Sequence, residues 1–181
     1  MNEVTENTSA GESVAEAKRE DRLITYLKSL EKRQDRAALA NLRRGLGKPP
    51  KTAMEMFPYL GQFLSYETKT HYENAVFIVA ALFAYYPDAP GNVKNLGASL
   101  RHLKDDSGSI EKRFVALLNS DEEDLPRHLR QIIGLLKARE VAVNWQQLLF
   151  DVQHWKNENL KESVQYLWAK EFWRKEKDTK N

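Results

Sequence analysis

Basic residues gather in one stretch of the chain, and their spacing suits the binding of phosphate groups. Five Lys or Arg and no carboxylate lie from residue 36 to 51. We expect Asp35 to cap a short helix there, with leucines along one face. Arg36 and Arg43 fall seven residues apart on one flank of that face, and Arg44 is about 100° further round. The spacing predicts a fan of guanidinium groups that could bind a polyanion.

A simpler explanation competes with this one. Basic residues in the last turn of any helix offset the partial negative charge of its exposed carbonyls. Gly45, Gly47 and the Pro49-Pro50 pair predict that the helix stops here, with Lys48 in the stop itself. The absence of a local acid to pair with the arginines favours binding of an external anion.

Two more basic clusters lie in the second half of the chain. Ile110 and Phe114 are expected to point inward together, which leaves Lys112 and Arg113 facing outward. A helix expected from residue 125 to about 138 carries four more basic residues on its outer faces or at its end: Arg127, Arg130, Lys137 and Arg139. If the clusters share a surface, they would bind a phosphate backbone without sequence preference, by release of counterions. The alternative is that they are ordinary solvated helix faces.

Residue spacings typical of catalysis are absent. The four histidines are 26 or 31 residues apart, and none is paired at metal-ligand spacing. The sequence GLGKPPK lacks the spacing of a phosphate-binding loop, and no nucleophile elbow is present. With no cysteine, disulfides and thiolate chemistry are excluded, which suits a reducing cytosol. We therefore predict a protein that is not an enzyme and needs no metal or cofactor.

The tryptophans allow two interpretations. Trp145, Trp155, Trp168 and Trp173 recur at helical spacing and could stack on bases. Apolar neighbours three and four residues away favour packing in a core instead.

Length and charge restrict the architecture. The 181 residues suffice for one compact domain or two small lobes. The net charge of +2 means that a nucleic-acid partner would meet a patch and not a bulk field. The most apolar run, residues 75–86, has 12 residues, against about 20 needed to span a bilayer. We expect a soluble, cytoplasmic protein with no membrane partner.

Apolar periodicity predicts an all-α protein, a bundle of eight or nine helices in two small lobes. Residues 1–21 carry six acids and two bases, and we expect an acidic, disordered arm there. The N-terminal lobe is predicted over 22–104 and the C-terminal lobe over 110–175, with the turn-rich DDSGS between them. The acidic run at 121–124 is predicted to cap the helix that follows it.

Several segments, in order, resemble the CasB family, the small subunit of the type I-E CRISPR surveillance complex called Cascade. The resemblance covers roughly residues 20 to 175. Its segments are ALANLRRG at 38–45, AALFAYYP at 80–87, LGASLRHL at 96–103, SIEKRFVALLNSD at 109–121, LPRHLRQIIGLL at 125–136, VNWQQLLFDVQHW at 143–155 and WAKEFW at 168–173.

The resemblance implies a non-enzymatic role. Two copies would lie along a backbone of crRNA-binding subunits, in contact with other Cascade subunits, with the crRNA and with each other as a dimer. They would stabilise the single-stranded non-target DNA displaced in the R-loop, where strand exchange is nearly balanced in energy, and would help to hold the crRNA and the target strand. The family's basic positions fall on Arg43 and Arg44, on Lys112 and Arg113, and on Arg130.

Two features depart from the family pattern. The acidic arm of residues 1–21 has no counterpart in it, and Asn144 stands where the family usually has an aspartate, although Asn also caps helices well. The alternative function is a helical adaptor whose basic faces bind acidic protein partners.

Overall fold

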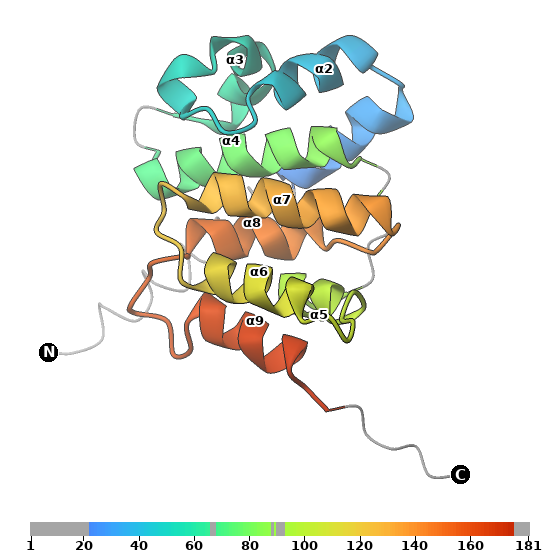
Figure 1. Ribbon diagram of the computed structural model, residues 1–181. Helices are drawn as coiled ribbons and strands as arrows, with labels where there is room; N and C mark the ends of the chain where they lie inside the picture. Colours follow the sequence, from blue (N-terminus) through green and yellow to red (C-terminus); the bar gives the residue numbers. More distant parts are fainter. Residues whose placement is uncertain (1–21, 66–67, 88, 90–92, 176–181) are drawn as a thin grey trace, which may run out of the picture. The chain divides into compact units, whose positions relative to one another are not determined.

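The computed structural model describes residues 22–65, 68–87, 89 and 93–175. Within these ranges the regular elements are all helical, and the expected all-α class is confirmed (Figure 1). None of the described helices is both long and apolar enough to cross a membrane. The predicted acidic arm of residues 1–21 lies outside the described residues. The chain divides into two compact units, Met1–Pro87 (unit 1) and Asp88–Asn181 (unit 2).

Unit 1 is organised around α4 (Thr70–Tyr85), which contains most of the apolar run at 75–86 and is buried over most of its length. Helix α2 (Arg36–Arg44) packs against α4 (Figure 1). A further helix covers residues 22–32. Four short helices complete the described part of the unit: the 3-10 helices η1 (Pro50–Thr52), η2 (Met54–Met56) and η3 (Gly61–Phe63), and the α-helix α3 (Phe57–Leu60). Residues 54–63 thus form three short turns in succession, and Pro58 lies in the first turn of α3, where its missing N–H is tolerated.

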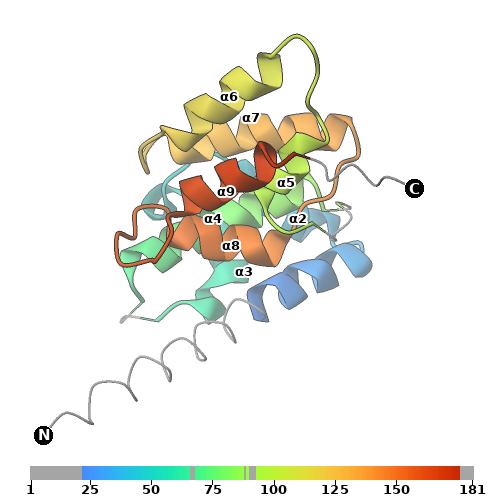
Figure 2. The ribbon, with the colours of Figure 1, turned by 90° about the horizontal axis from the view of Figure 1, so that it is seen from below.

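Unit 2 holds five α-helices in its described part. They are α5 (Leu96–Arg101), α6 (Ser109–Leu118), α7 (Leu125–Ala138), α8 (Trp145–Gln153) and α9 (Val164–Phe172). Helix α5 packs against α9 (Figures 1 and 2), and α6 packs against α7, beside which it lies in Figure 2.

The boundary between the units differs from the predicted one. We expected DDSGS at 105–109 to separate two lobes, but the division follows Pro87, and α5 belongs to unit 2. The reason is the close packing of α5 on α9. A Cβ atom on Gly97 would lie 2.0 Å from the carbonyl oxygen of Trp168, so only glycine lets the two backbones approach this closely.

Helix caps in unit 2 follow the sequence in one place and depart from it in another. Asn144 accepts a hydrogen bond from the Gln147 backbone N–H at 3.0 Å, so its expected role as a cap of α8 is confirmed. The acidic run before α7 does not cap by hydrogen bonding, because the Asp124 side chain accepts none from the helix backbone. Asp124 instead pairs with Arg127, three residues along the helix.

Tryptophan packing in the core is confirmed at three of the four positions. Trp145, Trp155 and Trp168 are buried, and the rings of the last two meet at 5.2 Å between centroids. Trp173 is 40% exposed, and its Nε1–H donates to Glu111 at 2.9 Å. Base stacking by tryptophan therefore stays a prediction for Trp173 alone.

One carboxyl group lies in this core with no basic side chain as its partner. Asp151 on α8 accepts hydrogen bonds from Trp168 Nε1 at 2.6 Å and from Gln147 Nε2 at 2.9 Å. Burial raises its pKa to about 6, and the two hydrogen bonds offset that rise only in part. The sequence analysis did not single out this residue.

Candidate nucleic-acid interface

Helix α2 presents the first basic cluster as the sequence predicted. The Asp35 side chain caps it by accepting a hydrogen bond from the Ala38 N–H at 3.0 Å. Leu39 and Leu42 are buried against the rest of unit 1. The basic residues are thereby left on the outer side of the helix.

Arg43 is exposed, but its side chain also makes a hydrogen bond within unit 1. Its Nε donates to the carbonyl oxygen of Ala84 at 3.2 Å, in the last turn of α4. Arg43 therefore compensates the C-terminal end of a helix, as the simpler explanation supposed, but that helix is α4 and not its own. Its two terminal nitrogens make no hydrogen bond with a described residue.

Two more basic side chains of this cluster bond to nearby polar side chains. Arg44 Nη1 donates to the side-chain oxygen of Asn41 at 3.1 Å, and Lys48 Nζ pairs with Glu55 Oε1 at 2.5 Å. The hydrogen bond from Lys48 lowers the pKa of Glu55, and the charge of Arg44 adds to the effect. The expected lack of a local acid concerned the arginines; Lys48, which it did not cover, has an acidic partner in Glu55. Arg36 is exposed, and its guanidinium has no hydrogen-bond or ion-pair partner among the described residues.

Helix α6 presents the second cluster in the predicted orientation. Ile110 and Phe114 are buried, and Lys112 and Arg113 are exposed. No ion pair or hydrogen bond joins either basic side chain to another described residue. The α6 pair is thus more available to an external anion than Arg44 or Lys48.

The basic residues of α7 differ in their surroundings. Arg127 Nη2 lies 3.2 Å from Asp124 Oδ1 and also 3.2 Å from His128 Nε2, whose pKa is lowered by burial and by the arginine charge. Arg130 is exposed and has no such partner in the described chain. Lys137 and Arg139 are exposed at the C-terminal end of the helix.

Histidine and carboxylate side chains do not gather into a metal site in the described part of the chain, where no three of them come together.

Comparison with known families gives one match that spans most of the chain. The model of the CRISPR-associated protein Cse2 family matches residues 38–173. The chain belongs to this family. The resemblance to CasB is thereby confirmed.

Individual relatives agree with this assignment. The CRISPR-associated protein Cse2 of Thermus thermophilus is 31% identical over 155 residues, which cover 84% of this chain and 89% of the relative. The crystal structure of CasB from Thermus thermophilus is similar with a TM-score of 0.73 at 30% identity, covering 84% of this chain and 96% of that one. A chain of a structure described as a CRISPR RNA-guided surveillance complex has the same fold, with a TM-score of 0.71 at 24% identity over 86% of this chain and 92% of that one.

Within this Cse2-family chain, nine of the ten candidate residues fall into two groups; Lys137, exposed at the end of α7, is assigned to neither. The first group is exposed and unpaired among the described residues: Arg36, Lys112, Arg113, Arg130 and Arg139. The second already bonds to the protein: Arg43, Arg44, Lys48 and Arg127. Charge patterning found both groups, but tertiary contacts alone separate them.

Proposed function

We propose that the chain is the non-catalytic small subunit of a type I-E CRISPR surveillance complex, Cascade. It would act there as a dimer, with the other subunits and the crRNA as partners. The observation that carries this proposal is the family match over residues 38–173. In that complex the subunit would bind the sugar-phosphate backbone of the displaced DNA strand and stabilise the R-loop. Modest backbone contacts suffice for this role, because the strand exchange is nearly balanced in energy.

The availability of the basic side chains suggests where the backbone binds. Lys112, Arg113 and Arg130 are exposed, have no acidic partner in the described chain and lie on two helices that pack together. A phosphate does not have to displace a protein contact to reach them. Arg43 and Arg44 are less available to a phosphate, because each guanidinium group already makes a hydrogen bond within unit 1.

Substitution of Lys112, Arg113 and Arg130 together by alanine is expected to weaken binding of a single-stranded DNA oligonucleotide. The slope of log affinity against log salt should fall by about 2, at about 0.7 per lost phosphate contact. The R43A/R44A variant should change the slope less. Fluorescence anisotropy with the full chain, between roughly 50 and 200 mM salt, measures both.

A charge-matched control distinguishes the loss of a local binding site from the general effect of lower positive charge. Alanine at Lys32, Lys69 and Lys161, which are also exposed, removes the same number of charges elsewhere. Equal losses of affinity for the oligonucleotide in the two triple variants would contradict the proposed binding surface.

The assignment to Cascade has its own test. Pull-down of the tagged chain from its native host should recover crRNA and the repeated backbone subunits, and their absence would contradict that assignment.

A further inference from the structure

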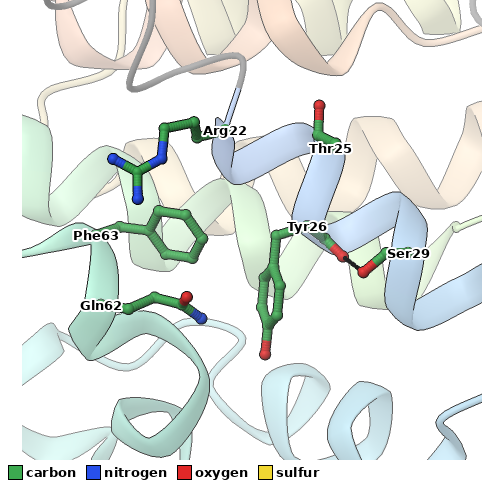
Figure 3. A pocket seen from close by; sticks show the side chains of 6 residues that line it. All are labelled: Arg22, Thr25, Tyr26, Ser29, Gln62 and Phe63. Atoms are coloured by element: carbon green, nitrogen blue, oxygen red, sulfur yellow. Dashed lines mark hydrogen bonds between the residues drawn. The ribbon is translucent and has the colours of Figure 1, made fainter.

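Unit 1 contains a pocket that lies apart from the α2 cluster. It has a volume of about 330 Å³ and lies between the helix over residues 22–32 and η3 (Figure 3). Its lining consists of Arg22, Thr25, Tyr26, Ser29, Gln62 and Phe63. The first four of these precede residue 38, where the family match begins, so the pocket is not a feature that the match defines.

Two aromatic rings form the apolar part of the pocket. The rings of Tyr26 and Phe63 are 5.4 Å apart between centroids and inclined at 53°. Both residues are half-buried, and their rings face the same space in Figure 3. A flat, apolar group could lie against either ring, and stacking of this kind is how proteins hold unpaired bases.

The polar part of the pocket offers a cation and hydrogen-bonding groups without a carboxylate. Arg22 and Thr25 are exposed, and their side chains make no hydrogen bond with a described residue. Gln62 uses its Nε2 to donate to the Tyr59 carbonyl oxygen at 3.2 Å, which leaves its Oε1 available to a donor. Burial raises the pKa of the Tyr26 hydroxyl, so that group stays protonated and neutral at physiological pH.

We propose that this pocket holds one unpaired base of a single-stranded nucleic acid. The base stacks on Phe63, the adjacent phosphate pairs with Arg22, and Gln62 Oε1 accepts a hydrogen bond from the base edge. Because Arg22, Thr25 and Gln62 are exposed, the pocket is open to solvent and fits a group carried on a longer chain better than an enclosed small molecule. The inference rests on the proposed function for the presence of such a strand, and adds a contact to a base where that function invoked only phosphates.

The test compares two labelled oligonucleotides of equal length, one with thymine bases and one with abasic sites. Both carry the same phosphates, so only contacts to bases distinguish them. Phe63→Leu should lower the affinity of the full chain for the thymine oligonucleotide by at least about fivefold and leave the abasic one unchanged. Phe57→Leu is the matched control, because Phe57 pairs with Phe77 at 5.2 Å outside the pocket and should change neither affinity.

Each outcome decides between the two proposals. If Phe63→Leu matches the parent on both oligonucleotides, or if the parent binds neither, the base pocket is wrong. If Phe63→Leu acts selectively while the K112A/R113A/R130A variant binds like the parent, the backbone site is wrong and the pocket stands. Should Phe63→Leu lose helical signal in circular dichroism, Gln62→Ala at the exposed rim decides by the same comparison, because Gln62 is assigned to the base edge and not to the phosphate.

Discussion

Replacing Gly97 by alanine is expected to destabilise unit 2 by about 1–3 kcal/mol, the range for forcing extra volume into a packed interior. The new Cβ atom would meet the carbonyl oxygen of Trp168 at 2.0 Å and its carbonyl carbon at 2.7 Å. Backbone atoms cannot move aside as a flexible side chain can, so α5 must shift away from α9. That loss outweighs the gain of roughly 1 kcal/mol that alanine brings inside a helix.

Urea unfolding followed by tryptophan fluorescence measures this effect in unit 2 specifically. All four tryptophans, from Trp145 to Trp173, lie in that unit. The control is Gly61→Ala in unit 1, where a Cβ atom meets nothing within 4 Å and the backbone is helical. An unchanged midpoint for Gly97→Ala would mean that the contact between α5 and α9 tolerates a larger separation.

The same glycine explains why helices were predictable from the sequence and their partners were not. Leu96 and Leu100 recur at helical spacing in the sequence, which indicates a helix with one apolar face, and both leucines are buried in α5. An apolar stripe along a helix does not identify the helix that packs against it. The pairing of α5 with α9 depends on a glycine that local sequence reasoning treats as a weak helix former, and the division between the compact units lies one helix before the predicted lobe boundary.

For the candidate interface, too, the basic residues could be predicted from the sequence but their partners in the folded chain could not. Charge patterning located Arg43 and Lys48 because a run of bases is visible in sequence. Their actual partners, the Ala84 carbonyl oxygen and the Glu55 carboxylate, lie outside the run and are brought there by folding. Outward orientation of Lys112 was predictable, since helix periodicity fixes it once its buried neighbours are known.

Asp151 could have been found by the same periodicity. It follows Leu148 by three residues and precedes Trp155 by four, so helical geometry places it on the flank of the apolar stripe. An acid at such a position is either paired or destabilising when ionised. Among the described residues it has two uncharged hydrogen-bond donors and no cationic partner.

Stability of unit 2 is therefore expected to fall as pH rises from about 4 to 7. The folded-state pKa of Asp151, about 6, lies above the ordinary 3.8, so the folded state binds the extra proton in that interval. Ionisation of the folded protein at higher pH costs about 3 kcal/mol, from roughly 1.4 kcal/mol per pKa unit. Asp151→Asn keeps an oxygen for Trp168 Nε1 and removes the ionisation.

Asp151→Asn should accordingly raise the free energy of unfolding by about 1–3 kcal/mol at pH near 8, with the gain vanishing at pH near 4. In the Asp151→Asn variant, the new NH2 group faces Gln147 Nε2, so two donors meet. Gln147 must then rotate its side chain to present its oxygen, and this rotation makes the gain smaller than the full ionisation cost. Urea unfolding at several pH values, followed by tryptophan fluorescence, measures the two curves. Glu158→Gln, at an exposed carboxylate, should run parallel to the parent. Parallel curves for Asp151→Asn and the parent would instead mean that Asp151 ionises in the folded protein as readily as it does in the unfolded chain.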